Sequence, residues 1–228
     1  MPPVSLFLTG TDTGVGKTHT ATCLLRLLRA TGLRCAGFKP ICCGDRHDAE
    51  LLLAASSDGL AIDDVNPIWL KTPAAPYPAA LVEDVRINPS QLVARLRDLQ
   101  ARFDFVLVEG VGGWLVPIRR DYFVSDLAAA MQLPVLVVAL NRLGCLNHAM
   151  LTLRAIAAER LMCAGIVLNT PNALADHAST TNAEILAVTA GVSILQGLAA
   201  ETGQLAPEWQ ALMARLGVSV AIPKRHGI

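Results

Sequence analysis

Thr9-Gly10-Thr11-Asp12-Thr13-Gly14-Val15-Gly16-Lys17-Thr18 is the stretch that decides the fold of this chain. An apolar run over residues 4–8 precedes it, and a helical pattern over residues 19–30 follows it. Backbone N–H groups of such a glycine-rich turn converge on an anion, and the following helix adds the positive end of its dipole. Lys17 would contact the β- and γ-phosphates, and the Thr18 hydroxyl is placed to ligate Mg²⁺. The motif therefore predicts a phosphate-binding loop (P-loop) for ATP or GTP.

The first glycine of this loop is displaced by one residue from the common pattern. In G-x-x-x-x-G-K-[ST] it would stand at residue 11, whereas here it is Gly10. A glycine-rich turn with an exposed lysine is the alternative interpretation. The strand before the turn and the helix after it favour a variant P-loop instead.

The composition favours one α/β domain, residues 1–228, with small-molecule ligands. Hydrophobic residues make up 53% of the chain and charged residues 17%, so a large core is possible and part of the apolar surplus is expected in a subunit interface. The formal net charge is zero, which disfavours nucleic acid or an anionic membrane as a partner. We expect the partners to be small molecules and a second copy of the chain.

The cysteines and the apolar runs indicate a cytoplasmic protein. The six cysteines include no C-x-x-C pair and mostly stand in apolar runs, as is typical of a reducing compartment. No basic region precedes the first strand, so no secretion signal is expected. The longest apolar run, residues 127–140, is interrupted by Gln132 and Pro134 and is too short to cross a bilayer.

Short apolar runs alternate with longer helical patterns along the chain. The predicted strands are residues 5–8, 34–39, 105–108, 135–140, 163–168 and 192–195. The predicted helices are residues 17–30, 48–55, 89–102, 125–131, 147–159, 175–188 and 207–216. Strands that are apolar throughout are buried on both faces. The predicted fold is therefore α/β, a doubly wound, mostly parallel sheet with helices on both faces, of the P-loop NTPase type. The proline-rich segment 58–86 is expected to be a loop that lines a pocket, or a lid.

Ligands of such sheets bind beyond the carboxyl ends of the strands. This rule selects Lys39, Glu109, Asn141 and Asn169. Glu109 ends an apolar strand, where its carboxylate could lie opposite the P-loop and hold Mg²⁺. Lys39 is either a solvated strand end or a second cation that offsets the charge developing in phosphoryl transfer.

Two further features leave alternatives open. Asp48 either caps a helix or joins Glu109 and Thr18 around magnesium. The glycines that follow Glu109 let the backbone approach a ligand closely. Trp114 after them is either packed against a pocket wall or an ordinary core tryptophan.

Four motifs stand along the chain in this order: Gly10-Thr-Asp-Thr-Gly-Val-Gly-Lys-Thr18, Gly37-Phe-Lys-Pro40, Val108-Glu-Gly-Val-Gly-Gly-Trp114 and Leu143-Gly-Cys-Leu-Asn-His-Ala-Met-Leu151. In this order and spacing they resemble dethiobiotin synthetase. The resemblance covers about residues 5–169. Motifs in register are far more specific than a P-loop alone.

This resemblance implies an ATP-dependent ligase of biotin synthesis. In the family, CO₂ adds to an amine of 7,8-diaminononanoate, and the carbamate attacks the γ-phosphate of ATP. The second amine then attacks the anhydride and loses a proton, which closes the cyclic urea, releases phosphate and leaves ADP. Positioning and charge neutralisation suffice for these steps. The active unit implied is a homodimer with shared sites.

The resemblance also implies roles for individual residues. The catalytic residues would be Lys39 and Lys17. The Mg²⁺ ligands would be Thr18, Asp48 and Glu109. The ATP-binding residues would be Thr13, Gly14, Val15, Gly16, Lys17, Thr18, Glu109, Gly112 and Asn169, of which Asn169 resembles an adenine-binding asparagine. The diamine and its carbamate would meet Thr13, Cys43, Gly144, Cys145, Leu146 and Asn147, of which the last four would act across the dimer interface.

Three positions depart from the family pattern. Cys43 stands where the family has a serine, Tyr77 replaces a histidine after a proline, and Gln196-Gly-Leu-Ala-Ala200 replaces a Gly-x-x-Pro. A thiol is a weaker hydrogen-bond donor than a hydroxyl, so the substrate contact at Cys43 is expected to change. The other two departures concern loop packing and the wall beside the adenine.

Other functions compete with this interpretation. A ligase of the cobyrinic acid amidation type normally carries a glutaminase domain, for which this chain has no length. A ParA- or MinD-like switch ATPase needs a cationic surface for DNA or membrane, which the neutral charge and the lack of a basic amphipathic C-terminal helix disfavour. A nucleotide-binding paralogue with another substrate is the third alternative.

Overall fold

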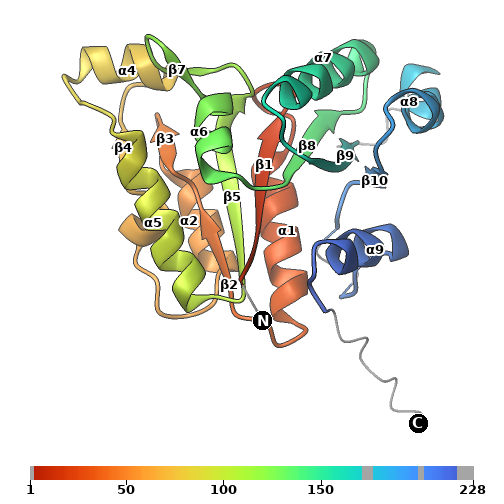
Figure 1. Cartoon of the computed structure of the whole chain (residues 1–228), viewed down its shortest axis with the longest axis horizontal. Helices are drawn as coiled ribbons and strands as arrows, with labels where there is room; N and C mark the ends of the chain where they lie inside the picture. The colour runs from red at the N-terminus through yellow and green to blue at the C-terminus, as the bar shows by residue number, and fades with distance from the viewer. Residues whose placement is uncertain (1–2, 171–176, 200–202, 220–228) are drawn as a thin grey trace.

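The computed structural model describes residues 3–170, 177–199 and 203–219. Its centre is a six-stranded sheet formed by β1 (Val4–Gly10), β2 (Cys35–Phe38), β5 (Phe105–Gly113), β8 (Val135–Leu140), β9 (Cys163–Asn169) and β10 (Ile194–Gln196). The strands lie in the order β10-β9-β8-β1-β5-β2, and each neighbouring pair is parallel. Figure 1 shows their carboxyl ends toward the top of the view. The predicted parallel α/β sheet is confirmed.

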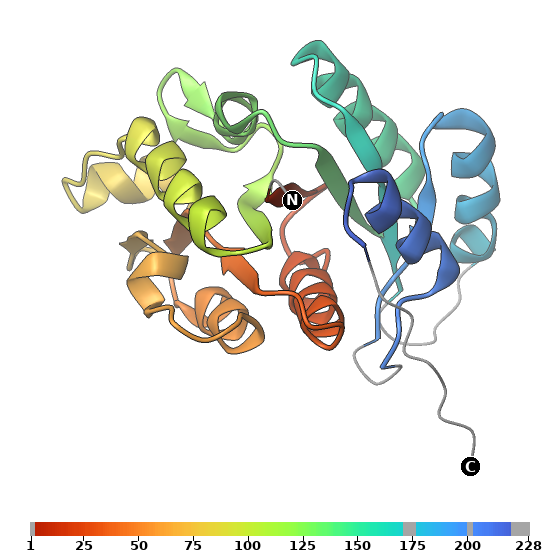
Figure 2. The same ribbon diagram turned by 60° about the horizontal axis from the view of Figure 1, so that its bottom comes forward.

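Helices cover both faces of this sheet (Figure 2). One face carries α1 (Lys17–Arg29), α2 (His47–Ala55) and α9 (Pro207–Arg215). The other carries α5 (Pro89–Arg102), α6 (Val124–Met131), α7 (Cys145–Ala158) and α8 (His177–Thr189). Each face has its own apolar core, as expected of a doubly wound fold.

Successive residues of the central strands enter opposite cores. On β1, Leu6 and Leu8 pack under α1, whereas Phe7 packs on the other face. All three side chains are fully buried. This alternation explains why the strands read as continuous apolar runs, since no side of them meets water.

The segment 58–86 holds regular structure that its sequence did not predict. It contains α3 (Ile62–Val65), β4 (Ile68–Leu70) and α4 (Pro76–Val82). β4 pairs in parallel with β3 (Ile41–Cys43), and a small antiparallel pair, β6 (Pro117–Arg119) and β7 (Tyr122–Phe123), follows β5. These elements are two to seven residues long, too short to show a period. β3 and β4, in addition, pair across 24 intervening residues. The expectation of a loop is therefore corrected, whereas the expectation that the segment lines a pocket is confirmed for residues 73–76.

Two predicted boundaries also change. α7 begins at Cys145 rather than at residue 147, because Gly144 adopts a left-handed conformation (φ 93°) and caps the helix there. β5 continues through Gly113 because it pairs with β1 as far as Gly10. The first two residues of the predicted helix 175–188 lie outside the described residues. Within the described ranges, no helix is long and apolar enough to cross a membrane.

Candidate functional site

The P-loop leaves the sheet where the strand order changes direction. From β1 the chain proceeds to β2 on one side, whereas β8, β9 and β10 lie on the other. In open parallel sheets this reversal opens a crevice at the carboxyl ends, and ligands bind there. Residues 11–16 run through this crevice before α1 begins at Lys17.

Close packing explains two glycines of the loop, Gly10 and Gly16. A Cβ at Gly10 would lie 2.7 Å from the carbonyl oxygen of Asp12 and 2.8 Å from Cγ2 of Val15. Gly16 has φ 93°, and a Cβ there would lie 1.9 Å from Nδ2 of Asn169. A side chain would collide at either position. The displaced first glycine thus fits a loop that folds tightly over Gly10.

Lys17 is buried at the bottom of this loop. Its Nζ donates a hydrogen bond to the carbonyl oxygen of Asp12 over 3.0 Å. Burial, and next the nearby charge of Lys39, lower the pKa of Lys17 to about 8, although Glu109 and Asp48 oppose the shift. A buried ammonium with a single neutral partner is suited to an incoming anion.

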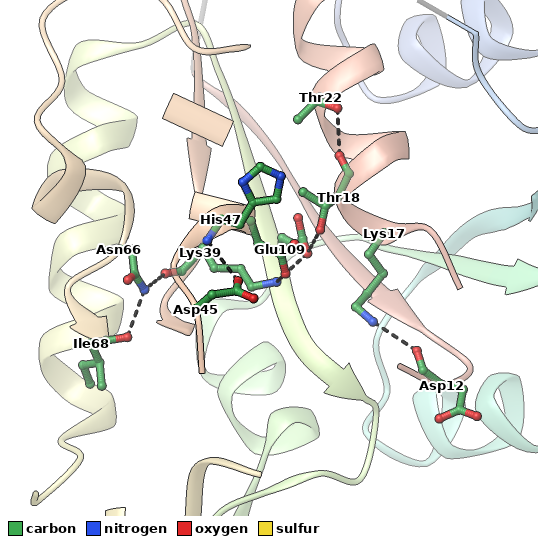
Figure 3. Close-up of polar contacts among 11 residues, drawn as sticks. Asp12, Lys17, Thr18, Thr22, Lys39, Asp45, His47, Asn66, Ile68 and Glu109 are labelled. Carbon is green, nitrogen blue, oxygen red and sulfur yellow. Dashed lines mark hydrogen bonds and ion pairs between the residues drawn. The ribbon is translucent and has the colours of Figure 1, made fainter. Parts of the chain in front are cut away.

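A cluster of opposite charges lies beside the loop, in which Lys39 and Glu109 are buried (Figure 3) and the Asp48 side chain is 47% exposed. Nζ of Lys39 is 2.5 Å from Oε1 of Glu109 and 2.8 Å from Oδ2 of Asp48. The Thr18 hydroxyl donates to the same Oε1 over 2.8 Å. Burial by itself would lower the pKa of Lys39, but the two carboxylates outweigh burial and raise it. Lys39 therefore stays charged and points into the site, which the sequence alone left open.

Asp48 does not cap its helix. The capping position of α2 is Arg46, and Asp48 is the second residue of the helix. Burial would raise the pKa of Asp48, but Lys39 outweighs it and the pKa is lowered. Of the two interpretations that the sequence left open, capping is wrong, and the carboxylate lies in the charged cluster.

The residues around Thr18 fit a divalent cation. Oε2 of Glu109 is buried without a hydrogen-bond partner, while Oε1 already meets Thr18. No three His, Cys, Asp or Glu side chains gather as a metal cage in the part of the chain that the structure describes. Mg²⁺ in nucleotide sites needs no such cage, since a hydroxyl, one or two carboxylates, phosphate oxygens and water complete its shell. The free carboxylate oxygen beside a hydroxyl matches that donor set.

One cavity of about 630 Å³ joins the P-loop to the charged cluster. Its volume lies in the range of small-molecule sites. Of the predicted site residues it is lined by Thr13, Gly14, Gly16, Lys17, Thr18, Lys39, Cys43, Asp48, Glu109 and Gly112. Residues 73–76 of the proline-rich segment line it as well, as expected for that segment. The sequence reasoning missed further lining residues: His19, Cys42, Asp45, Val111 and Val116. His19 and Asp45 adjoin predicted motifs, and this adjacency was the available signal.

Other predicted residues lie outside this cavity. Val15 is buried in the core, and Asn169 lies behind Gly16, where its Nδ2 donates to the carbonyl oxygen of Val15 over 2.9 Å. Asn141 joins β8 to α8 by donating to the carbonyl oxygen of Ser179. The segment 144–147 at the start of α7 is also absent from the cavity lining.

Trp114 is a core residue rather than part of the pocket wall. Its ring is 4% exposed and meets Phe7 edge-on, with centroids 6.2 Å apart. Cys42 and Cys43 do line the cavity, but burial raises the pKa of each thiol to about 11. Both thiols are therefore protonated at neutral pH and are unsuited to act as nucleophiles.

Relatives of assigned function share most of this chain. A family described as an AAA domain matches residues 4–202. The ATP-dependent dethiobiotin synthetase BioD of Akkermansia muciniphila is 44% identical over 78% of this chain and 84% of its own length. The protein of the same name from Aromatoleum aromaticum is 45% identical over 73% of this chain and 78% of its own length. The protein from Endomicrobium trichonymphae is 34% identical over 84% of this chain and 90% of its own length.

Solved structures share the fold at low sequence identity. A complex of Cyanothece McdA with ATP has a TM-score of 0.55 at 14% identity and covers 97% of this chain and 99% of that chain. A ParA family ATPase from Chlorobium tepidum has a TM-score of 0.52 at 13% identity, and the match covers 92% of this chain and 89% of that chain. At such identities the likeness extends to the fold alone.

The pKa of Lys17 predicts how nucleotide binding depends on pH. Triphosphate binding favours the ammonium form, whose pKa is about 8 without ligand. Affinity for ATP should therefore be steady below pH 7.5 and fall on the order of tenfold between pH 7.5 and 9.5 as Lys17 loses its proton. Titration calorimetry at several pH values measures this.

Lys17→Arg is the matched control for this titration. Its guanidinium stays charged over the whole range, so its affinity should be weaker but nearly independent of pH. An equal pH dependence in the wild type and in Lys17→Arg would contradict the assignment to Lys17.

Proposed function

This chain belongs to the dethiobiotin synthetase family, and on that premise we propose that it uses ATP to form the cyclic urea of dethiobiotin from 7,8-diaminononanoate and CO₂. The products are dethiobiotin, ADP and phosphate, and the reaction belongs to biotin biosynthesis. The structural observation that carries the proposal is the cavity in which the P-loop meets the charged cluster of Lys39, Glu109 and Asp48. Such a cavity can hold a triphosphate and a small second substrate together.

The proposed reaction has three steps. An amine nitrogen of the diamine attacks CO₂ and loses a proton, which forms a carbamate. A carbamate oxygen attacks the γ-phosphorus of ATP while the bond to the β-phosphate oxygen breaks, which yields ADP. The second amine attacks the carbonyl carbon, closes the ring, loses a proton and expels phosphate. None of these steps requires a protein nucleophile, so the chain's contribution is to orient the reactants and to balance charge.

Two lysines supply the positive charge for this chemistry. We propose that Lys17 exchanges its bond to the carbonyl oxygen of Asp12 for the β- and γ-phosphates, helped by the backbone of residues 13–16. Lys39 would stabilise the transferring phosphoryl group and the carbamate, because its buried ammonium stays charged. Thr13 and Cys43 line the same cavity and would contact the substrate.

Mg²⁺ would be held by Thr18, Glu109 and Asp48. When bound, it would neutralise charge on the β- and γ-phosphates. In the structure Lys39 occupies one oxygen of each carboxylate, which leaves the unpartnered Oε2 of Glu109 for a cation. Asn169 would contact the adenine from behind Gly16.

We propose a homodimer in which the start of α7 completes the site of the other subunit. Gly144, Cys145, Leu146 and Asn147 lie outside the cavity of their own chain. Nearby, the side chains of Leu143 and Leu151 are 82% and 57% exposed. Exposed leucines favour burial in an interface, and the N-terminus of α7 suits the carboxylate of the diamine.

The cytoplasm is the proposed location. The six cysteines, all within the described residues, form no disulfide. A switch ATPase remains the alternative, and the likeness to a ParA family ATPase extends only to the fold.

Phosphate release tests the proposed function. With Mg·ATP and bicarbonate, release should depend on 7,8-diaminononanoate and equal the dethiobiotin formed, as measured by mass spectrometry. Lysine replaces the diamine as a control and should give no release. Release that is independent of the diamine, or nucleotide binding without release, would point to the switch ATPase or to a paralogue with another substrate.

Replacement of Lys39 tests its charge-balancing role. Lys39→Met keeps the apolar stem but leaves Glu109 and Asp48 without their cation. We expect kcat to fall about 100-fold or more, because the transferring group loses its electrostatic stabilisation. Lys71→Met, which removes an exposed lysine, is the control. If Lys39→Met keeps more than half of the wild-type kcat, the proposed role of Lys39 is wrong.

Complementation tests the shared site. Lys17→Ala disables the P-loop, and Asn147→Glu places a negative charge where the substrate carboxylate would bind. Each variant alone should be inactive, whereas mixed dimers carry one intact site and should recover about a quarter of wild-type activity. If the mixture stays inactive although sedimentation shows mixed dimers, the sites are not shared.

A further inference from the structure

Asn66 is a fully buried amide next to the charged cluster (Figure 3). Its Nδ2 donates to the carbonyl oxygen of Lys39 over 2.8 Å and to that of Ile68 over 2.9 Å. The backbone N–H of Lys39 in turn donates to the carbonyl oxygen of Val65 over 2.8 Å. Residues 65 and 66 therefore hold both backbone polar groups of Lys39, just past the end of β2 at Phe38.

The same amide also fixes the start of α2. Nε of Arg46 donates to Oδ1 of Asn66 over 2.9 Å, and Nη2 of Arg46 donates to the backbone oxygen of Asn66 over 2.6 Å. Arg46 is the capping residue of α2, two residues before Asp48. Asn66 thus connects the backbone that presents Lys39 with the helix that presents Asp48.

Few side chains could replace Asn66. The side chain at position 66 donates two hydrogen bonds and accepts one, and an asparagine amide can do both at this distance from the backbone. An aspartate has the same shape and could still accept from Arg46, but it would turn oxygen toward two carbonyl oxygens. A buried group that loses its partner costs about 1–3 kcal/mol.

The ion pairs of Lys39 depend on this placement. Its Nζ reaches Glu109 over 2.5 Å and Asp48 over 2.8 Å, and both distances leave little room for a shift. Misplacement of a reacting group by about 1 Å can cost about 100-fold in rate. We propose that Asn66 is a positioning residue that aims Lys39 at the transferring group and, through Arg46, keeps Asp48 against it. The proposal rests on the proposed role of Lys39.

Asn66→Asp tests this positioning. We expect kcat to fall at least tenfold, while the Kd for ATP changes by less than about twofold, because the P-loop is untouched. Asn88→Asp, at the capping residue of α5, is the matched substitution and should keep wild-type kcat. Leu212→Ala, in the core beneath α9, controls for lost stability alone. If kcat of Asn66→Asp stays within about threefold of Leu212→Ala, the proposal fails.

Arg46→Lys is the second variant, for the case that Asn66→Asp does not fold. Arg46 is only partly buried, so the variant should fold, but a lysine cannot make both bonds to Asn66 in the same geometry. We expect an intermediate loss of kcat with unchanged Kd for ATP. Wild-type kcat in Arg46→Lys would overturn the link to Asp48.

Lys39 acetylation gives a readout that needs no synthetase activity. Acetic anhydride reacts with free amines, and mass spectrometry reports the modified fraction at Lys39. In the wild type the buried, paired ammonium should react slowly, whereas in Asn66→Asp the rate should rise several-fold above that in Leu212→Ala. Equal rates would overturn the positioning role. If the wild type forms no dethiobiotin, the proposed function is wrong. The acetylation rates at Lys39 would still test the positioning role of Asn66.

Discussion

The buried ion pair of Lys39 with Glu109, extended by the half-exposed Asp48, sets the constraint on which the site depends. Removal of a charge from water costs several kcal/mol, and a buried pair compensates only when its geometry is good and its remaining polar atoms are satisfied. The partners come from the residue after β2, from the middle of β5 and from the first turn of α2. Those three elements must therefore meet in one arrangement, which Thr18 completes from α1.

Crowding around the P-loop is the second constraint. Gly10, Gly16 and Gly112 each stand where a Cβ would come within 3 Å of a neighbour from another part of the loop or site. The neighbours belong to the P-loop, to the end of β9 and to the turn after β5. A loop packed this closely holds its N–H groups toward one point, and such preorganisation is what an anion site requires. The unusual position of Gly10 is thus a property of the packing.

The architecture and the chemistry are separate questions in this protein. McdA and the ParA family ATPase share the sheet and its helices, yet a fold of this type hosts many functions. Another part of the cavity wall is made by Cys42, Cys43 and Asp45, on and after β3, and by residues 73–76, which lead into α4. A triphosphate alone needs no such wall. Its presence beside two buried lysines favours a second, small substrate over a partner macromolecule.

The sequence by itself determined the parallel sheet, the P-loop and the candidates Lys39 and Glu109, because each is coded locally. Apolar runs show burial on both faces, glycines show close approach, and a polar residue that ends an apolar run lies at the ligand edge. The tertiary structure decided what Asp48 and Trp114 do, where α7 begins, and that β3 and β4 pair. It also placed Asn66 against the backbone of Lys39, 27 residues away. Such contacts join segments that no periodic pattern or sequence motif connects. They form only when the core brings these segments together.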